Sequence, residues 1–341
     1  MNIKEAWVTA RRFGVQVKRV RRIVNGVYRV RSSDGRQFAL KPMAYPLAQL
    51  RWIDSVLHQL KESGFAHISW RDRNQPEGRK LYVISRVGIP YVLNPWIPGR
   101  WPAPQSPVEM KACGAALAEL HQKGVVSPRS PRRMIMIGKW PAELQAKHAR
   151  LVRQIAISKR SAHPHRLHSF LRRHGNELLR YSREAQSLLG CSDYAQECKS
   201  ARPLHVCHGD GGPTNFTVNR EGVYLIDFET LRIDLRSYDL YRVIYNSCKD
   251  HNWDFTIAQH IFDGYQTISE LNANDIDFIK AWLRFPRTTT LLLNRYYVSK
   301  STKEKTRITA KLPAAIRVER RMTAFLAQLS RYQMDGLQST T

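Results

Sequence analysis

Two short polar motifs enclosed by strand-like segments constrain the fold of this chain more than any other feature. The first reads His-Gly-Asp at 208–210 and is completed by Asn215, and the second reads Asp-Phe-Glu at 227–229. Apolar runs flank both motifs and predict strands at 203–207, 216–218 and 223–226, with a turn at 219–222. A hairpin of this kind places the polar side chains at the mouths of buried strands, where they can form one site.

The order of these residues is the order that kinase catalytic loops use for phosphoryl transfer. Asp210 can accept or orient the proton of an attacking hydroxyl. Asn215 and Asp227 are oxygen donors that can hold Mg²⁺ against nucleotide phosphates, so that charge is neutralised as the γ-phosphoryl group moves. The alternative, a turn followed by an ordinary strand end, requires two spaced motifs and two strand patterns to coincide. The motifs therefore predict a site that uses ATP and Mg²⁺.

The composition is that of a soluble globular protein. With 341 residues, 43% of them hydrophobic, the chain is long enough for two lobes or two modest domains. The first residues do not resemble a signal peptide, and no apolar run approaches the ~20 residues that span a bilayer. We therefore expect a cytoplasmic protein with no membrane partner. The five cysteines include no Cys-x-x-Cys pair, which favours reduced thiols over a disulfide frame or a zinc ribbon.

The net charge of +27 is unevenly distributed. Residues 129–206 carry 16 Lys and Arg against 5 Asp and Glu, a net +11, and residues 280–321 carry 12 against 2, a net +10. Residues 207–279, which contain both motifs, carry 5 against 12, a net −7. An acidic island is expected where a divalent cation is held, whereas the basic flanks indicate an anionic partner or simply solvated faces.

The N-terminal part predicts a small antiparallel sheet that could bind a nucleotide. Residues 15–41 alternate between apolar and polar with turns at 25–26 and 33–35. Asn25 and Gly26 lie where a kinase nucleotide loop is expected, although the Gly-x-Gly-x-x-Gly pattern is absent. The segment Phe-Ala-Leu-Lys resembles the strand whose lysine pairs with the α- and β-phosphates, which makes Lys41 a candidate anchor. A surface strand lysine is the alternative.

A helix and a hinge are expected next. Pro46 can open a helix whose apolar residues fall at helical spacing until Gly64. Kinases use such a helix to present a Glu to the strand lysine, and the candidates here are Asp54 and Glu62. A strand at 80–85 precedes a segment that passes from apolar residues into a Pro/Gly-rich break at 89–99, which suits a hinge whose backbone binds adenine. The candidate residues there are Tyr91 and Leu93.

The remaining chain is expected to be mostly helical. Helices are predicted at 108–124, across much of 129–203, and at 238–246, 255–265, 275–297 and 313–330. We interpret His121, at the end of the first of these, as a buried structural histidine. The predicted fold is α+β and bilobal, like a protein kinase: an N-terminal nucleotide-binding lobe at 1–95, made of a small antiparallel sheet plus one helix, and a larger, mainly helical C-terminal lobe at 96–341.

Several of these features together resemble one superfamily. The small lobe with Lys41, the hinge at 91–99, Leu-His at 120–121, the two motifs and Tyr-Asp-Leu at 238–240 are similar to aminoglycoside phosphotransferases and choline kinases. Within this superfamily the chain looks most like the CotS-type bacterial spore coat kinases, especially in the hinge and the long helical stretch. The resemblance covers nearly the whole chain.

The resemblance implies roles for individual residues. Asp210 would be the catalytic base, Asn215 and Asp227 the magnesium ligands, and Lys41 the phosphate anchor, while Asp239 and His208 would support the catalytic loop. Departures from protein kinases favour the small-molecule branch: Gly-Gly at 211–212 follows the catalytic Asp where a Lys is common, Glu stands in place of the Gly of Asp-Phe-Gly, and no Ala-Pro-Glu occurs downstream.

The leading hypothesis is an ATP- and Mg²⁺-dependent phosphotransferase acting on a hydroxyl of a small-molecule or sugar-like acceptor. The basic segments would repel cationic acceptors, so a neutral or anionic acceptor is favoured, with Arg284, Arg287 and Arg295 as candidates for binding it. The second hypothesis is a catalytically silent kinase fold that serves in spore coat assembly, with coat proteins as partners. Specific nucleic-acid binding is not expected, because no nucleic-acid motif is recognisable.

Overall fold

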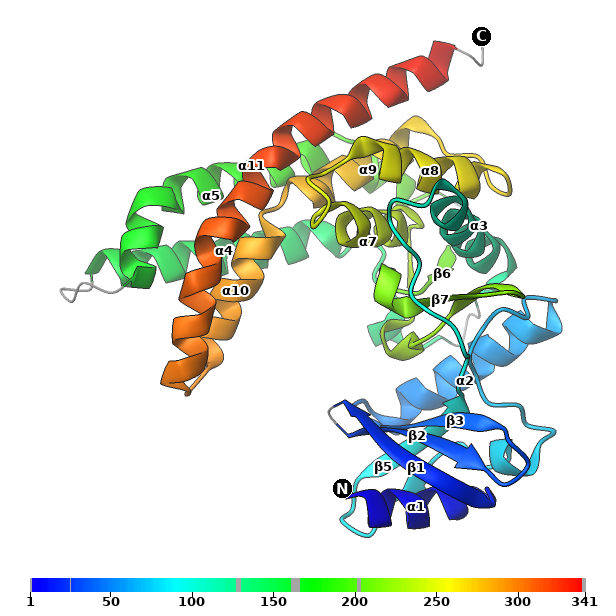
Figure 1. Cartoon of the computed structure of the whole chain (residues 1–341). Helices are drawn as coiled ribbons and strands as arrows, with labels where there is room; N and C mark the ends of the chain where they lie inside the picture. The colour runs from blue at the N-terminus through cyan, green and yellow to red at the C-terminus, as the bar shows by residue number, and fades with distance from the viewer. Residues whose placement is uncertain (1, 25, 127–129, 161–165, 201–203, 339–341) are drawn as a thin grey trace.

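The computed structural model describes residues 2–24, 26–126, 130–160, 166–200 and 204–338 of the chain. The chain forms a small lobe around a sheet and a larger helical lobe (Figure 1). The sheet is five-stranded and antiparallel, with strands in the order β1-β2-β3-β5-β4. Its strands are β1 (Val17–Val24), β2 (Val27–Ser32), β3 (Gln37–Pro42), β4 (Val83–Ile84) and β5 (Pro90–Pro95).

Helices cover both faces of this sheet. Helix α1 (Ile3–Arg11) packs its apolar side on the outer face, where Tyr28, Leu40 and other alternate strand residues form a small core. Helix α2 (Leu47–Glu62) lies between the sheet and the large lobe (Figure 1), and it buries the leucine and isoleucine stripe expected from the sequence. Gly64, with φ +86°, ends this helix in a conformation that glycine adopts without strain.

The large lobe combines helices with two short antiparallel sheets. Strand β6 (His205–Cys207) pairs with β9 (Arg232–Asp234), and β7 (Phe216–Asn219) pairs with β8 (Gly222–Leu225). The helices are α3 (Pro107–Lys123), α4 (Trp140–Arg160), α5 (Arg166–Gly190), α6 (Tyr194–Glu197), α7 (Ser237–Cys248), α8 (Phe255–Gln266), α9 (Ala273–Arg284), α10 (Arg287–Val298) and α11 (Thr302–Gln338). One apolar core runs from α2 through α3, α7, α8 and α9, so both lobes share it.

Two glycines allow the closest helix crossing in this core. A Cβ added at Gly114 of α3 would lie 2.1 Å from the Ile261 carbonyl oxygen, and one added at Gly264 of α8 would lie 1.9 Å from the Lys111 carbonyl oxygen. No side chain fits at either position. This contact fixes α3 against α8 and thereby positions His121, near the end of α3, beneath the catalytic loop.

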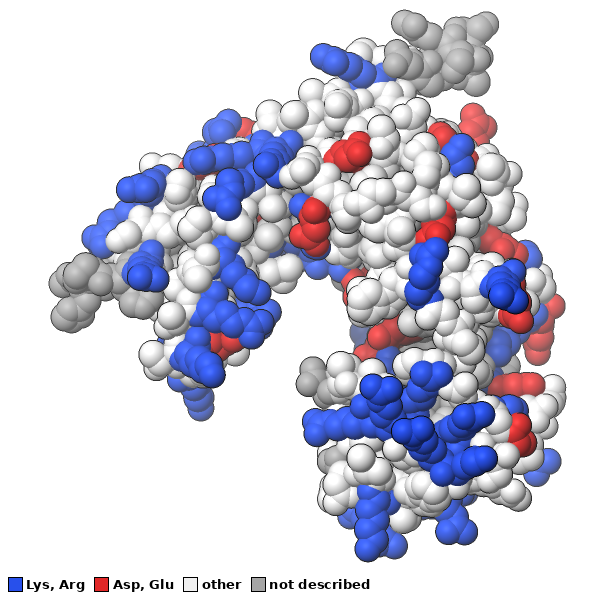
Figure 2. Space-filling model, in the orientation of Figure 1, with Lys and Arg blue, Asp and Glu red and all other residues white. Residues whose placement is uncertain are grey.

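Helices α4, α5, α10 and α11 form a projecting helical arm (Figure 1). Leucine and isoleucine residues give the arm its own core, which includes Leu151, Leu171 and Leu312. Figure 2 shows Lys and Arg gathered on the arm and on the sheet of the small lobe, with a wide hollow between them. The basic segments of the sequence therefore lie mainly on the arm.

The predicted α+β architecture, a small antiparallel sheet lobe with a larger helical lobe, is confirmed. Some elements differ in detail: α1 was not expected, the strand at 80–85 shrinks to β4, and the last helix begins at Thr302. The helix expected at 275–297 is two helices, because Pro286 stands at the break between α9 and α10 and changes the chain direction. The division into lobes at residue 95 stays a prediction.

Candidate active site

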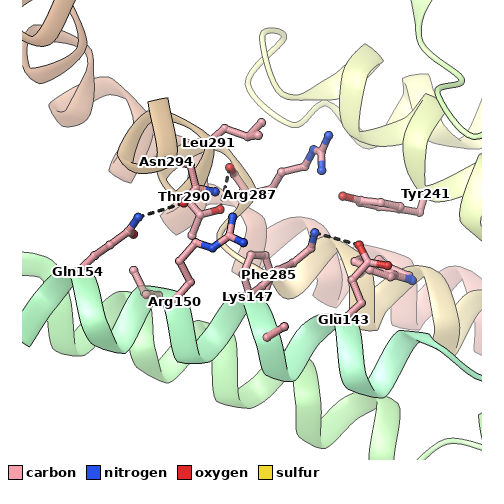
Figure 3. A pocket seen from close by; sticks show the side chains of 13 residues that line it. Glu143, Lys147, Arg150, Gln154, Tyr241, Phe285, Arg287, Thr290, Leu291 and Asn294 are labelled. Atoms are coloured by element: carbon pink, nitrogen blue, oxygen red, sulfur yellow. Dashed lines mark hydrogen bonds and ion pairs between the residues drawn. The ribbon is translucent and has the colours of Figure 1, made fainter. Parts of the chain in front are cut away.

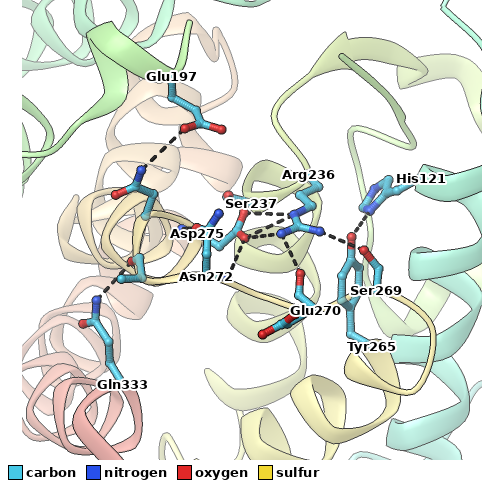
Figure 4. Close-up of polar contacts among 12 residues, drawn as sticks. His121, Glu197, Arg236, Ser237, Tyr265, Ser269, Glu270, Asn272, Asp275 and Gln333 are labelled. Carbon is cyan, nitrogen blue, oxygen red and sulfur yellow. Dashed lines mark hydrogen bonds and ion pairs between the residues drawn. The ribbon is translucent and has the colours of Figure 1, made fainter. Parts of the chain in front are cut away.

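The first motif lies in a loop that Asp239 holds from below. From the first turn of α7, the Asp239 carboxylate accepts the backbone N–H of His208 at 2.5 Å and of Gly209 at 2.7 Å. His121 Nε2 lies 3.1 Å from the same carboxylate, and its Nδ1 lies 2.8 Å from the Tyr265 hydroxyl (Figure 4). Burial alone would raise the pKa of Asp239, but these hydrogen bonds hold the pKa below its usual value. The carboxylate thus remains charged and fixes the loop backbone.

His208 ties the first motif to the second. Its Nε2 donates to the Ile226 carbonyl at 2.9 Å, and its ring lies 5.1 Å from the Phe228 ring. The Thr230 hydroxyl donates back to the His208 carbonyl at 2.9 Å. Because the histidine is fully buried, these contacts make the two motifs one rigid unit.

Asn215 and Asp227 present oxygens that could hold a metal. The Asn215 amide nitrogen donates to the Asp210 carbonyl at 2.7 Å, which leaves the amide oxygen as the free acceptor. Asp227 has φ 70° and ψ 62°, a left-handed conformation that is rare outside glycine and typical of functional sites. Its carboxylate is 39% exposed. One carboxylate and one amide oxygen are hard ligands of the kind that Mg²⁺ uses.

Lys41 of β3 reaches this second motif from the small lobe. Its ammonium lies 2.6 Å from Asp227 Oδ1 and 3.2 Å from Glu229 Oε1. Burial raises the pKa of Glu229, while the adjacent Lys41 opposes that rise. The positive charge of Lys41 therefore lies between the carboxylates of Asp227 and Glu229. A metal–nucleotide complex at this position would meet both the carboxylates and the ammonium group.

Asp54, one of the two candidate partners of Lys41, does not contact it. Asp54 is buried on α2, where it accepts hydrogen bonds from Arg71 Nη2 and Arg73 Nη2, each at 2.6 Å, and from Trp70 Nε1 at 2.8 Å. These donors come from the loop after α2 and fully occupy the carboxylate. The other candidate, Glu62, is exposed.

Arg242 is a site residue that the sequence analysis missed. Its guanidinium bonds to Asp210 Oδ1, and its side chain is only 8% exposed. Although burial disfavours its charge, Tyr241 and Asp210 raise the pKa of Arg242, so it stays cationic. The sequence spacing could have predicted this role. Arg242 follows Asp239 by three residues, about one helical turn, and therefore faces the same loop.

Of the two glycines after Asp210, the second is tightly packed. A Cβ at Gly212 would lie 2.7 Å from the Asn246 amide nitrogen, which itself donates to the Gly211 carbonyl at 3.4 Å. A side chain at 212 would have to displace this amide, whereas a Cβ at Gly211 would meet only ordinary contacts, the nearest at 3.5 Å. Asp239, Arg242 and Asn246 form one face of α7 behind the loop, and Arg242 supplies the positive charge beside the candidate base.

The candidate nucleotide-binding residues are Asn25 and Gly26 in the nucleotide loop and Tyr91 and Leu93 in the hinge, and the structure supports only part of this assignment. Asn25 lies outside the described residues, and Gly26 has φ +83°, as a tight turn between β1 and β2 requires. Tyr91 and Leu93 direct their side chains into the outer core under α1, whereas Val92 faces the shared core. The side chains of Tyr91 and Leu93 therefore point away from the interlobe space, and only the backbone of these two residues could meet a nucleotide.

The three candidate acceptor arginines do not lie together. Arg284 is 5% exposed, bonds to Glu184 at 2.5 Å and lies over the Tyr181 ring at 3.8 Å, so it joins α9 to α5. Arg295 is exposed and pairs with Glu304 at 2.7 Å. Arg287 alone among the three lines a pocket on the inner side of the arm. Grouping them by helical spacing was wrong, because Pro286 separates the helices that carry them.

The fold is kinase-like. It has two lobes, and Lys41 of the small-lobe sheet contacts Asp227 next to the loop that carries Asp210 and Asn215. The comparison with known families is specific: the model described as the phosphotransferase enzyme family (APH) matches residues 17–282, and the chain belongs to this family. The resemblance to aminoglycoside phosphotransferases is thereby confirmed at the family level. No curated protein matches the chain.

Solved structures share this fold at low sequence identity. An aminoglycoside phosphotransferase from Alicyclobacillus acidocaldarius matches with a TM-score of 0.79 and 19% identity, covering 96% of both chains. The spectinomycin phosphotransferase APH(9)-Ia, in complex with ADP and spectinomycin, matches at 0.56 and 15%, covering 92% of this chain and 94% of that one. The amicoumacin kinase hAmiN, with AMP-PNP, Ca²⁺ and Ami, matches at 0.55 and 16%, covering 90% and 92%. Within the described residues, no helix is long and apolar enough to span a membrane.

Proposed function

We propose that this protein is an ATP- and Mg²⁺-dependent kinase that phosphorylates a hydroxyl of a small-molecule or sugar-like acceptor. The observation that carries the proposal is the contact of Lys41 with Asp227, 2.6 Å long, next to the loop that presents Asp210 and Asn215. Membership of the phosphotransferase family supports it, as do the nucleotide complexes of two structural neighbours.

Each group has a distinct task in this proposal. Asp227 and the free amide oxygen of Asn215 would hold the metal, and their donor types fit Mg²⁺. A bound Mg²⁺ supplies charge neutralisation at the β- and γ-phosphates. Lys41 would exchange its contact with Asp227 for the α- and β-phosphates, with Glu229 remaining beside it. The usual helix Glu is thus replaced by a carboxylate from the second motif.

Asp210 would accept the proton of the acceptor hydroxyl. Arg242 holds one carboxylate oxygen of Asp210, so the other oxygen is directed toward the acceptor. The neighbouring guanidinium also gives positive charge near the transferred group. Asp239 and His208 would act as positioning residues, because they hold the loop without touching substrate. Backbone groups of the 91–95 segment and the turn at Gly26 would bind the nucleotide's adenine and phosphates.

A location in the spore coat, with coat proteins as partners, rests on the CotS resemblance alone. The silent-scaffold alternative is disfavoured because Lys41, Asp210, Asn215 and Asp227 are all present and interconnected. The test is ADP formation from Mg²⁺-ATP with pooled sugars, polyols and spore-derived metabolites. The proposal predicts turnover with at least one pool that Asp210→Asn abolishes. Acceptor-independent ADP formation that Asp210→Asn leaves unchanged would contradict it.

A further inference from the structure

A pocket on the inner side of the helical arm has an unusual charge distribution. It lies where α4 and α10 approach α7 and α9, and its cavity volume is about 200 Å³ (Figure 3). This volume is below the roughly 300–1,000 Å³ of pockets that enclose whole drug-sized ligands, so it suits one substituent of a small molecule. Its lining includes three cations and one carboxylate: Lys147, Arg150, Arg287 and Glu143.

Only one of the three cations is neutralised. Lys147 pairs with Glu143 at 2.9 Å, one turn away on α4. Neither Arg150 nor Arg287 forms an ion pair with a carboxylate of the described chain. Figure 3 shows Arg150 extending from α4 toward α10, whereas Arg287 extends from α10 toward Tyr241 of α7. Both guanidinium groups therefore line one small cavity, and its carboxylate, Glu143, is paired with Lys147 instead.

Arg287 is also incompletely hydrogen-bonded. Its Nε is buried and has no hydrogen-bond partner within the described structure. A buried charged N–H without an acceptor is destabilising, so this guanidinium is kept in the cavity wall at a cost in stability.

The pocket and the partner of the candidate base lie on the same helix, α7. Tyr241 lines the pocket and stacks on Trp282 at 5.4 Å, which gives the cavity an aromatic wall. The next residue along α7 is Arg242, which bonds Asp210. An acceptor held in the pocket would therefore have to reach along α7 to meet Asp210. The nucleotide phosphates would lie elsewhere, at Lys41 and Asp227.

We propose that Arg150 and Arg287 bind a phosphate or carboxylate group of the acceptor and thereby select an anionic hydroxyl compound. The inference rests on the proposed kinase function, and it further specifies that the acceptor is an anion. A guanidinium presents paired N–H donors that match both groups. The net positive cavity would at the same time exclude cationic acceptors.

The first test is binding of inorganic phosphate to the full-length protein in saturating Mg²⁺-ADP, which occupies the nucleotide site. We expect one phosphate site, weakened at least tenfold in the double variant Arg150→Gln/Arg287→Gln. The matched control is Arg153→Gln/Arg295→Gln, which removes the same charges from the same two helices outside the pocket. Equal weakening in both double variants, or no phosphate site in wild type, overturns the proposal.

The second test compares acceptors on one scaffold: glucose, glucosamine, glucuronate and glucose 6-phosphate, each measured by binding under the same conditions. We expect either anionic sugar to bind at least tenfold more tightly than glucose, and the pocket variant to lose that preference. The two anionic arms distinguish carboxylate from phosphate. Equal binding of all four sugars overturns the inference. Mg²⁺-ADP binding, measured first, reports on the kinase proposal separately.

Discussion

Replacing Asp239 by Asn tests how strongly a buried carboxylate holds the catalytic loop. The carboxylate accepts three hydrogen bonds, from two backbone N–H groups at 2.5 and 2.7 Å and from His121 at 3.1 Å. An Asn side chain has the same shape but keeps one acceptor oxygen and places an NH₂ group opposite a former donor.

The expected loss of stability follows from these contacts. One buried donor left without an acceptor costs about 1–3 kcal/mol, and charge-assisted bonds are roughly twice as strong as neutral ones. Together these give about 3–4 kcal/mol of lost unfolding free energy. This is within the about 5–15 kcal/mol of a typical protein, so the variant should still fold. Because the loop presents Asp210, a shift of about 1 Å should lower turnover roughly 100-fold.

The assay is urea unfolding together with ADP formation at a temperature where the variant is folded. Asp275→Asn is the matched control, because Asp275 is also buried and is held by Arg236 and Ser237 away from the catalytic loop (Figure 4). The control should lose stability but keep its turnover per folded molecule. An unfolding free energy within about 1 kcal/mol of wild type, or equal turnover losses in both variants, would refute the reasoning.

Two further predictions concern buried charge and pH. Asp54→Ala leaves Arg71 buried without its carboxylate and should cost about 3–5 kcal/mol in urea unfolding, whereas a loss below about 1 kcal/mol would exclude a structural role. Burial, with the adjacent His121, lowers the pKa of His205 to about 4 from 6.5, so the unfolded state takes up a proton first. Stability should therefore fall as pH drops from 6.5 to 4, by up to about 3 kcal/mol, and His205→Asn should remove this component. An identical pH dependence in the variant would contradict the assignment.

The local parts of the site could be predicted from sequence because their spacing is short. Asn215 and Asp227 flank the β7–β8 hairpin and Asp210 lies five residues before Asn215, so strand alternation and turn residues nearly determine their arrangement. Asp54 lies on the apolar face of α2 that the helical periodicity predicts. Its partners could not be predicted, because periodicity gives a buried face but not the residues of a following loop that meet it.

Contacts between distant segments were the hardest to predict. The bond between Arg242 and Asp210 joins residues 32 positions apart, and it depends on how α7 packs behind the loop. The acceptor arginines were misjudged for a similar reason: the break at Pro286 turns α10 toward α4, which brings Arg287 opposite Arg150 and leaves Arg284 in the core. Such pairings require the helix packing itself.

The central claim is that Asp227 holds a metal–nucleotide complex while Asp210 acts only on the acceptor. Calorimetric titration of Mg²⁺-ATP into wild type, Asp227→Ala and Asp210→Ala tests it most directly. We predict binding to wild type, loss of binding in Asp227→Ala, and near-wild-type affinity in Asp210→Ala. No affinity of the wild type at millimolar ATP, or equal affinities of wild type and Asp227→Ala, would contradict the claim.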